Sequence, residues 1–380
     1  MALKIAILGT RGIPNNYGGF EQIAGHLSKG LVEKGHSVTV YNSHKHPYKK
    51  NSWNGVQIIH CFDPEFLIGT AGQFIYDLNC ILDTRKKNFD IILMLGYTSS
   101  SVWKNFYPKN VVVITNMDGL EWKRSKYSKY VRKFLLYAEK LAVTSGDFLI
   151  ADSVSIKKYL DEKYHVNSEY IPYGAEAIDI NDDVFASCKL EKQEYFLLIA
   201  RMEPENNIET TLDGFHKTKC DKSFIVIGNT KNRFGSYLTK KYKDDVRIKF
   251  FGSMFNPKTV RALITYSYIY FHGHSVGGTN PSLLEAMAGK TLIAAHDNPF
   301  NRSVLNEDGV YFSNVPDIYK IIRSTVRGER EAKMITNNYQ KITTEFNWLK
   351  VVTSYEAFFY KCYAEKTGNE IVLNPGYLIK

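Results

Sequence analysis

Short apolar runs alternate with longer segments that carry apolar residues at helical spacing along most of the chain. The first run, residues 4–8, precedes a loop with four glycines and a predicted helix at 20–34. A strand, a glycine-rich loop, a helix and a second strand in this order are typical of a doubly wound parallel sheet. Five further strands are predicted in the first half, at 37–41, 56–60, 90–95, 111–115 and 148–151, and two further helices at 74–87 and 128–144.

The same alternation begins again after a polar stretch at 175–194, which we predict to be a linker. Strands are then predicted at 195–200, 223–227, 246–251, 268–272 and 291–295, each separated from the next by a helical segment, and a last helix at 348–364. The pattern predicts an α/β protein with two doubly wound domains, 1–174 and 195–347, that face each other across a cleft.

Length and composition agree with this interpretation. A chain of 380 residues, 44% hydrophobic and 23% charged, is expected to fold as two soluble domains. Its five cysteines contain no Cys-x-x-Cys pair and predict reduced cytoplasmic thiols, with neither a disulfide framework nor a zinc site. Because a strand is predicted from residue 4 onwards, we expect no signal peptide, and no apolar run approaches the roughly 20 residues that span a bilayer.

The formal net charge of +10 favours an anionic partner: nucleic acid, a membrane surface or a phosphorylated substrate. No RNA-recognition or helix-turn-helix signature supports nucleic acid. Residues 121–140 hold seven lysines and arginines against two glutamates, with aromatic and apolar residues between them. This segment has two interpretations, an amphipathic helix on an anionic leaflet or the solvated face of an ordinary helix.

The segment 271–289 carries the most informative chemistry. It places a buried strand end before Gly277 and Gly278, and then Asn280 and Pro281, which suit a helix N-cap and a first helical position. Backbone N–H groups and the positive end of the helix dipole make such a loop an anion site. Glu285, one turn into the helix, suits sugar hydroxyls, although complementing the helix dipole is the simpler interpretation.

A second candidate half-site follows the first strand of the second domain. Arg201 is placed there to bind a diphosphate bidentately, whereas a lone arginine is otherwise more often a solvated surface residue. A dinucleotide-dependent oxidoreductase would also have two α/β domains, but residues 9–12 do not match Gly-x-Gly-x-x-Gly. A non-catalytic sugar-nucleotide binding module and a soluble transferase of small acceptors remain open.

The chain resembles retaining, nucleotide-sugar-dependent glycosyltransferases of the GT-B fold, family four. More narrowly, it is similar to the bacterial rhamnosyltransferases, with a DUF1972-type first domain, that build cell-surface polysaccharides such as capsule and O-antigen. The resemblance covers nearly the whole chain, and it implies that the helix 348–364 crosses back to the first domain, before a tail at 365–380. Its motifs lie at 9–21, 151–153, 171–174, 200–207 and 274–288, with the start of the crossing helix at 346–348.

The resemblance implies roles for individual residues. Arg201 would bind the donor diphosphate, Glu285 the ribose, and Asp118 would lie near the transferred sugar; these three are the candidate catalytic residues. Glu21 is a candidate acceptor contact, although a structural hydrogen-bonding role for Glu21 or Asp118 is equally plausible. Donor contacts are expected at Gly18, Gly19, Gly252, His274, Ser275, Gly277, Gly278, Thr279 and Asn280.

Three positions depart from the family pattern. Gly277 replaces the glutamate that usually contacts the sugar, Asn206 replaces a lysine that accompanies the arginine, and Met117 replaces a histidine. We interpret these departures as changes of sugar specificity, and they fit a deoxy sugar such as L-rhamnose from TDP-rhamnose. The expected acceptor is a lipid-diphosphate-linked glycan at the inner face of the plasma membrane. For residues 121–140 the resemblance therefore favours the first interpretation, a helix that binds the anionic membrane surface. No Asp-x-Asp motif is present, so we expect neither a metal nor a cofactor.

Overall fold

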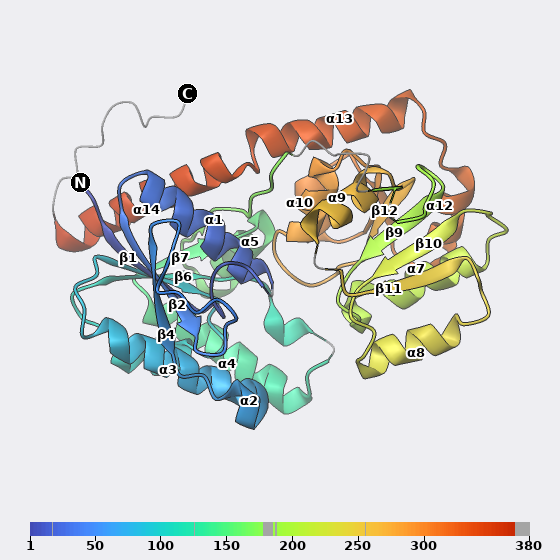
Figure 1. Cartoon of the computed structure of the whole chain (residues 1–380). Coiled ribbons are helices and arrows are strands. Elements are labelled where there is room, and N and C mark those ends of the chain that lie inside the picture. Colours follow the sequence, from blue (N-terminus) through green and yellow to red (C-terminus); the bar gives the residue numbers. More distant parts are fainter. Residues whose placement is uncertain (17, 125, 178–184, 187, 255, 369–380) are drawn as a thin grey trace.

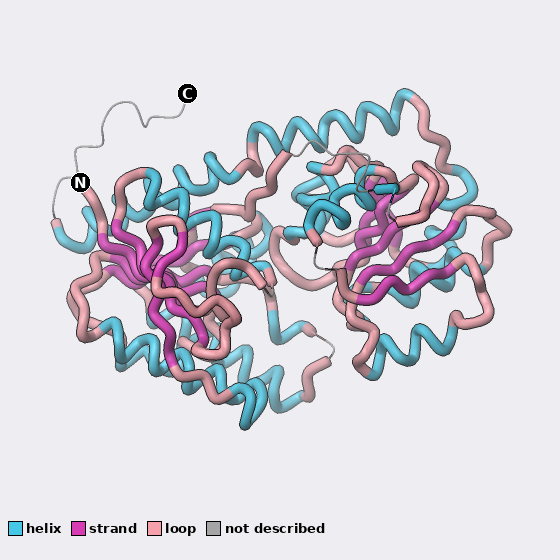
Figure 2. Tube along the Cα trace, viewed as in Figure 1, coloured by secondary structure: helices cyan, strands magenta, loops and turns pink. Residues whose placement is uncertain are grey.

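The computed structural model describes residues 1–16, 18–124, 126–177, 185–186, 188–254 and 256–368. Two α/β domains lie side by side, and a long helical segment near the C-terminus passes from the second domain back to the first (Figure 1). In both domains helices surround a central group of strands, as Figure 2 shows. This architecture confirms the predicted fold class of two doubly wound domains.

The first domain contains an eight-stranded sheet in the order β3-β4-β2-β1-β5-β6-β7-β8, which is parallel except for β3. Its strands are β1 (Lys4–Leu8), β2 (Ser37–Ser43), β3 (Ser52–Trp53), β4 (Val56–Cys61), β5 (Ile91–Leu95), β6 (Val112–Asn116), β7 (Phe148–Ala151) and β8 (Glu169–Tyr170). Its helical elements are α1 (Gly19–Glu33), α2 (Glu65–Ile68), η1 (Gly69–Ala71), α3 (Gly72–Thr84), η2 (Ser101–Phe106), η3 (Glu121–Lys123), α4 (Lys129–Ser145) and α5 (Val154–Tyr164). Because the central strands are covered on both faces, nearly every residue in them is apolar and buried.

The second domain contains a parallel six-stranded sheet in the order β11-β10-β9-β12-β13-β14. Its strands are β9 (Tyr195–Ile199), β10 (Ser223–Ile227), β11 (Ile248–Gly252), β12 (Ile269–His272), β13 (Ile293–His296) and β14 (Val310–Phe312). The helices that follow the linker are η4 (Pro204–Asn206), α7 (Ile208–His216), α8 (Arg233–Lys241), α9 (Pro257–Thr265), α10 (Pro281–Ala288), α11 (Pro299–Leu305), α12 (Val315–Ser324), α13 (Glu329–Thr344) and α14 (Trp348–Thr367). In both sheets the strand order reverses beside the first strand, β1 or β9, and ligands bind at such switch points.

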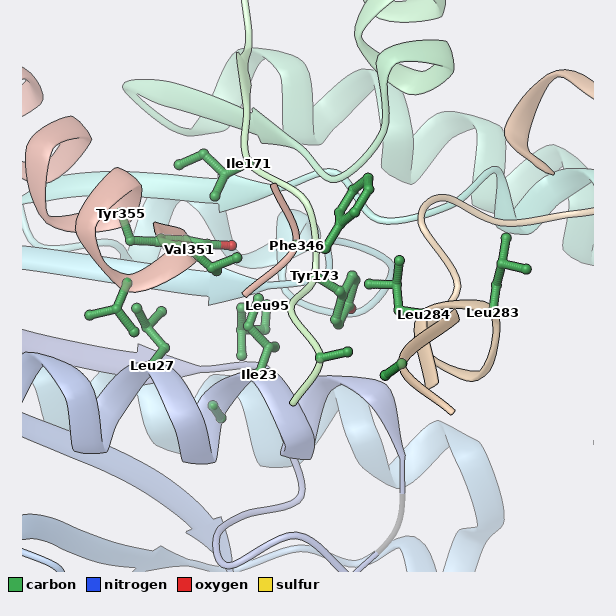
Figure 3. Close-up of a cluster of buried hydrophobic side chains, with 14 of the residues drawn as sticks. Ile23, Leu27, Leu95, Ile171, Tyr173, Leu283, Leu284, Phe346, Val351 and Tyr355 are labelled. Carbon is green, nitrogen blue, oxygen red and sulfur yellow. The ribbon is translucent and has the colours of Figure 1, made fainter. Parts of the chain in front are cut away.

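Two crossing segments connect the domains. The Ala175 N–H donates to the Phe346 carbonyl oxygen at 2.7 Å, so the outgoing and returning chains run side by side. Buried apolar side chains from α1, α10, α14 and residues 171–175 form one cluster beneath this crossing (Figure 3). The crossing is therefore packed, whereas residues 178–184 and 187 of the predicted linker lie outside the described residues.

Helix α14 lies against the first domain, as the resemblance implies. Glu356, on α14, is buried and accepts from Lys34 Nζ at 2.8 Å, and it lies 3.1 Å from His36 Nε2. Tyr355 Oη accepts from Asn116 at the end of β6 at 3.1 Å. These contacts fasten the returning helix to the first sheet. Of the predicted tail, residues 365–367 belong to α14, and 369–380 lie outside the described residues.

Candidate functional site

Two helix N-termini, one from each domain, face each other across the cleft. Helix α1 begins at Gly19, and a Cβ built on Gly19 would lie 3.5 Å from Cγ of Pro281, the first residue of α10. Each N-terminus carries the positive end of a helix dipole and backbone N–H groups without intrahelical partners. The fold therefore brings the predicted glycine loops together at a place suited to an anion.

The loop before α10 keeps several N–H groups available. Asn280 caps the helix as predicted, because its side chain accepts from the Ser282 N–H at 3.0 Å. The N–H groups of Gly277, Gly278 and Asn280 make no hydrogen bond to other residues in the described ranges. Gly277 has φ +147°, and a Cβ there would point into open space. A ligand with phosphate oxygens therefore finds donors in this loop and room beside Gly277.

Arg201 lies two residues beyond the end of β9 and is exposed at the same cleft. Its backbone is fixed by Asn206, whose buried side chain donates to the Arg201 carbonyl oxygen at 2.8 Å. Within the described part of the chain, the Arg201 guanidinium makes no hydrogen bond or ion pair. Burial lowers the pKa of nearby His274 to about 3, and Arg201 lowers it further, so this imidazole is neutral. Arg201 thus presents to the cleft a guanidinium that no described carboxylate bonds directly, with Asp118 and Glu203 within reach of its charge.

Asp118 and Asp152 form a carboxyl pair on the first domain's side of the cleft. Asp118 follows β6 and Asp152 follows β7, and these strands are neighbours, which brings the two residues to one edge of the sheet. Burial raises the pKa of both carboxyls, and the Asp118 carboxyl raises the pKa of Asp152 further. Such a pair holds a proton more readily than separate aspartates do.

Ion pairs connect the two sides of the cleft and correct part of the prediction for residues 121–140. Lys126 Nζ lies 2.9 Å from Oε1 of Glu203 in the second domain. Arg124 bonds Glu121 at 2.7 Å, and its Nη1 lies 3.8 Å from Glu203 and 3.9 Å from Glu205. Both cations precede α4, so they bind carboxylates at the cleft and do not belong to an amphipathic outer face.

Glu285 lies on the part of α10 that faces the crossing. It is half-buried, and burial raises the pKa of its carboxyl, while Gln22 of α1 donates to it at 3.5 Å. Both residues border a pocket between the domains that also includes His26, Glu176, Arg261 and Trp348. The ring of His26 stacks on Trp348 with centroids 4.2 Å apart. Glu285 therefore faces a small space that both domains line.

Four other predicted residues have roles that the structure defines locally. Glu21 is buried behind the first glycine loop and accepts from the Arg11 N–H at 2.8 Å and from Thr10 Oγ1 at 3.1 Å. This geometry corresponds to the structural alternative for Glu21. Ser275 donates to the Glu205 carbonyl oxygen at 2.7 Å, and the ring of His274 stacks on His272. Gly252 ends β11 at φ +72°, with open space where a Cβ would point.

Sequence reasoning missed Asp152, Arg124 and Glu203 as cleft residues. Asp152 was visible as a carboxylate directly after a predicted strand, next in order after the strand that precedes Asp118. Arg124 was interpreted as one cation of a helical run, since its pairing depends on the other domain. Among the residues that the structure describes, no group of three or more histidine, cysteine or acidic side chains is arranged to hold a metal ion.

Helix α4 exposes apolar side chains on its outer face, including Tyr130, which is 86% exposed. Phe134 of α4 contacts Phe74 of α3, with ring centroids 5.6 Å apart. Near α3, the short helix α2 adds exposed Phe66, Leu67 and Ile68, so the apolar surface is wider than the predicted segment. Figure 1 shows α2, α3 and α4 along one edge of the first domain. None of the described helices has the length and hydropathy needed to cross a bilayer.

Two family models match consecutive parts of the chain, and the boundary between them lies near the crossing. Residues 2–176 match a family model described as "Domain of unknown function (DUF1972)", and residues 179–341 match the model "Glycosyl transferases group 1". No curated protein sequence matches the chain significantly.

Solved structures of similar fold cover nearly the whole chain. Sucrose-phosphate synthase from Thermosynechococcus elongatus has a TM-score of 0.80 at 16% identity, covering 96% of this chain and 100% of its own. HepE from Anabaena, solved with UDP and glucose, has a TM-score of 0.73 at 13% identity, with coverage of 94% and 100%. The trehalose 6-phosphate synthase of Burkholderia multivorans has a TM-score of 0.73 at 10% identity, with coverage of 98% and 100%. At these identities the likeness concerns the fold, and the match of the second domain adds the class of activity: the chain is a glycosyltransferase with the GT-B fold.

Proposed function

We propose that the protein transfers L-rhamnose from TDP-rhamnose to a lipid-diphosphate-linked glycan during the synthesis of a cell-surface polysaccharide. The observation that carries the donor class is the meeting of two helix N-termini beside Arg201, whose guanidinium has no partner in the described residues. Dipoles, open N–H groups and a guanidinium together suit a diphosphate. The Anabaena protein of similar fold was solved with UDP and glucose, which supports a nucleotide sugar as donor here.

The reaction breaks the bond between the anomeric carbon of the sugar and the diphosphate, and it forms a bond to the acceptor oxygen. Negative charge grows on the leaving diphosphate in the transition state, and groups that stabilise this charge accelerate the step. Arg201 and the open N–H groups of Gly277, Gly278 and Asn280 would do so. We propose retention of the anomeric configuration, with the leaving phosphate accepting the acceptor's proton, and we expect no requirement for a metal.

The rest of the donor would extend from this anion site. We propose that Glu285 binds the ribose, since the carboxylate borders the pocket between the domains. Gly252 would lie near the nucleobase. Because residue 277 is a glycine with open space beside it, this loop offers no carboxylate to a sugar hydroxyl. The absence of that contact supports a deoxy sugar as the donor. A UDP- or GDP-hexose donor is the alternative within the same fold.

The acceptor assignment rests on the outer surface of the first domain. Exposed aromatic side chains on α4 are accompanied by Lys129, Lys133 and Lys140, also exposed, and α2 adds Leu67, which is 68% exposed. Apolar groups flanked by lysines suit the interface of an anionic leaflet. We propose that this surface holds the protein peripherally on the cytoplasmic face of the membrane, where a lipid-linked acceptor would be. A soluble transferase acting on a small acceptor is the alternative.

The decisive experiment is a donor screen in EDTA with a synthetic lipid-diphosphate glycan as acceptor. TDP-rhamnose, UDP-glucose, UDP-galactose, UDP-N-acetylglucosamine and GDP-mannose would be compared at equal concentration. Transfer from TDP-rhamnose alone is the expected result. Transfer from a UDP- or GDP-sugar instead would overturn the sugar assignment, and restoration of activity by Mg²⁺ would overturn metal independence.

Membrane binding is tested separately by co-sedimentation with vesicles that contain anionic lipid. The variant Tyr130→Ala/Phe134→Ala is expected to lose most binding, whereas Tyr237→Ala, an exposed tyrosine of the second domain, should bind as the wild type does. Equal sedimentation of all three proteins would contradict the proposed surface.

A further inference from the structure

Asp152 is an aspartate whose side chain is buried without the partners that a structural carboxylate has. It is 1% exposed, and the described groups that its carboxyl meets are the Asp118 carboxyl and the main-chain N–H groups of Thr279 and of Asp152 itself, with no cation among them. Burying a carboxyl beside a second carboxyl costs free energy, so its presence needs a reason. The pKa of Asp152 is raised by burial and then by Asp118, which means that the neutral acid is favoured at this place.

The reason lies on the other side of the cleft. Gly278 of the second domain packs directly on the Asp152 side chain: a Cβ built on Gly278 would lie 1.9 Å from Oδ1 and 2.2 Å from Cγ. The next residue, Thr279, donates its hydroxyl to the Asp152 carbonyl oxygen at 2.5 Å. Both backbone and side chain of Asp152 therefore contact the loop that precedes α10.

A second contact between the first domain and the loop that precedes α10 lies next to Asp152. Gly119, which follows Asp118, lies opposite Gly277, and a Cβ on Gly119 would be 3.7 Å from the Gly277 Cα. The loop at 277–279 is thus held between the ends of β6 and β7 of the first domain. Its N–H groups, left open for an anion, are positioned by a surface that the other domain supplies.

We propose that Asp152 is a positioning residue that seats the loop 277–279 against the first domain in the closed cleft. In this arrangement the carboxyl group fills the space that a side chain on residue 278 would need, and the main chain of Asp152 holds Thr279. The inference rests on the proposed use of this loop for the donor diphosphate. Asp152 acts through the loop and does not itself need to touch the substrate.

Position 278 allows a sharp test, because its backbone does not require glycine. Gly278 is absent from the residues with positive φ, and the three atoms nearest to a Cβ at this position all belong to Asp152. Gly278→Ala should therefore prevent closure, and Asp152→Ala in the same chain should remove the clash and restore it. Such a rescue is not expected if Gly278 matters for the backbone alone.

Closure is measured first without ligand, as the radius of gyration from small-angle X-ray scattering. Gly278→Ala should be more extended than the wild type, and the double variant Gly278→Ala/Asp152→Ala should return to the wild-type value. Gly25→Ala, whose Cβ would meet only Trp53 at 3.9 Å, is the matched control and should scatter as the wild type does. An unchanged radius for Gly278→Ala, or a double variant as extended as the single one, would overturn the proposal.

Kinetics then separates this inference from the proposed function. With the donor identified in the screen, Gly278→Ala is expected to lower kcat/KM about 100-fold, and the double variant to recover at least about tenfold of that loss. Asp152→Asn, which keeps the shape of the neutral acid, should stay within about threefold of the wild type and serves if the alanine variant folds poorly. A wild-type protein that binds no nucleotide would refute the proposed function, yet it would leave the scattering result intact.

Discussion

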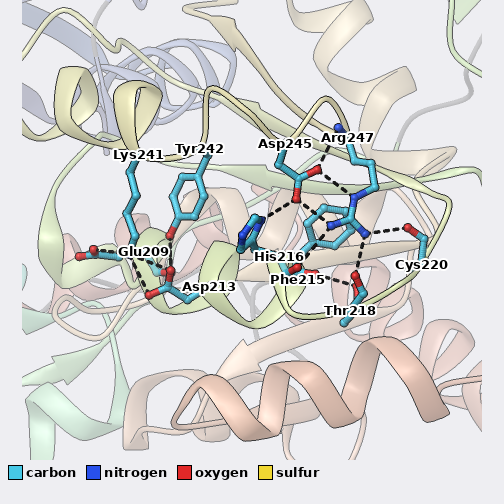
Figure 4. A network of polar contacts seen from close by, with 10 residues as sticks. All are labelled: Glu209, Asp213, Phe215, His216, Thr218, Cys220, Lys241, Tyr242, Asp245 and Arg247. Carbon is cyan, nitrogen blue, oxygen red and sulfur yellow. Dashed lines mark hydrogen bonds and ion pairs between the residues drawn. The ribbon is translucent and has the colours of Figure 1, made fainter.

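Two groups of charged residues in this protein follow opposite rules. On the outer face of the second domain, Asp245 accepts from Arg247 Nε at 2.9 Å and Nη2 at 2.7 Å, and it lies 2.8 Å from His216 Nδ1 (Figure 4). Arg247 also donates to the carbonyl oxygens of Thr218 and Cys220. At the cleft, the Asp152 carboxyl meets a second carboxyl, that of Asp118, and Arg201 forms no ion pair within the described residues.

The pKa directions express the same contrast. Hydrogen bonds from Arg247 lower the pKa of Asp245 to about 2, whereas burial and a second carboxyl raise the pKa of Asp152. A satisfied network stabilises the fold and leaves no group for a ligand. Unsatisfied groups gathered at a cleft cost stability, and they are expected where a protein binds or reacts. The two regions thus differ in whether their charged side chains are paired with groups of opposite charge, and less in how many charged side chains they contain.

The largest expected effect comes from replacing an arginine at the cleft, and the matching variant replaces an arginine of the surface network. Arg201→Ala should lower the rate of sugar transfer at least about 100-fold while leaving the fold intact, since it removes a charge that stabilises the leaving diphosphate. Arg247→Ala should do the reverse, keeping transfer and lowering the midpoint of urea unfolding. Initial rates and circular dichroism of both variants test the pair. Wild-type turnover by Arg201→Ala would refute the donor-site assignment.

The sequence predicts the fold of this protein better than it predicts the site. The central strands were predicted within one or two residues, because buried parallel strands are continuous apolar runs. The strands β3, β8 and β14 were not predicted, since two or three residues are too few to show a period. Asn280 and Pro281 were identified correctly at the start of α10, because capping depends on neighbouring residues alone.

The site depends on contacts that no local pattern contains. Glu21 was left between two roles, and only the folded loop shows its carboxylate bonded to Thr10 and Arg11. Arg124 belonged to a basic run, but its carboxylate partners Glu203 and Glu205 come from the other domain. A sequence reveals which groups carry charge; whether a charge is satisfied depends on three-dimensional neighbours.

The second prediction concerns the satisfied network. Asp245→Asn should lower the free energy of unfolding by about 2 kcal/mol, because it removes charged hydrogen bonds from Arg247 and His216. Urea unfolding followed by circular dichroism is the suitable measurement, since the second domain from 195 to 347 contains no tryptophan. Asp244→Asn, an exposed neighbour, is the matched control. Equal losses in both variants would contradict the role of the network.

Its pH dependence has a definite sign. A carboxyl with a folded-state pKa of about 2 contributes stability that is fully present above its unfolded pKa of about 4 and is lost as the pH falls towards 2. Asp245→Asn should therefore flatten the acid side of the stability profile. The pKa of Asp152 is raised in the folded state, so its effect on stability has the opposite sign. The free energy of unfolding that Asp152 contributes falls as the pH rises above about 4. Asp152→Asn should remove that decline, and a profile unchanged in both variants would show that neither carboxyl is perturbed.

The smallest expected effect belongs to a pair that combines features of both regions. Lys126 and Glu203 are satisfied partners 2.9 Å apart, as in the surface network, but they lie across the cleft. Because the lysine side chain is 32% exposed, the pair is worth less than about 1 kcal/mol, and Lys126→Ala should change the donor KM less than about fivefold. The change should become smaller in 0.5 M NaCl, because salt at this concentration screens exposed charges over about 4 Å. Lys140→Ala, an exposed lysine of α4, should leave the donor KM unchanged. A loss as large as that of Arg201→Ala would place Lys126 among the groups that bind the donor, and satisfaction of a charge would then no longer distinguish structural from functional residues.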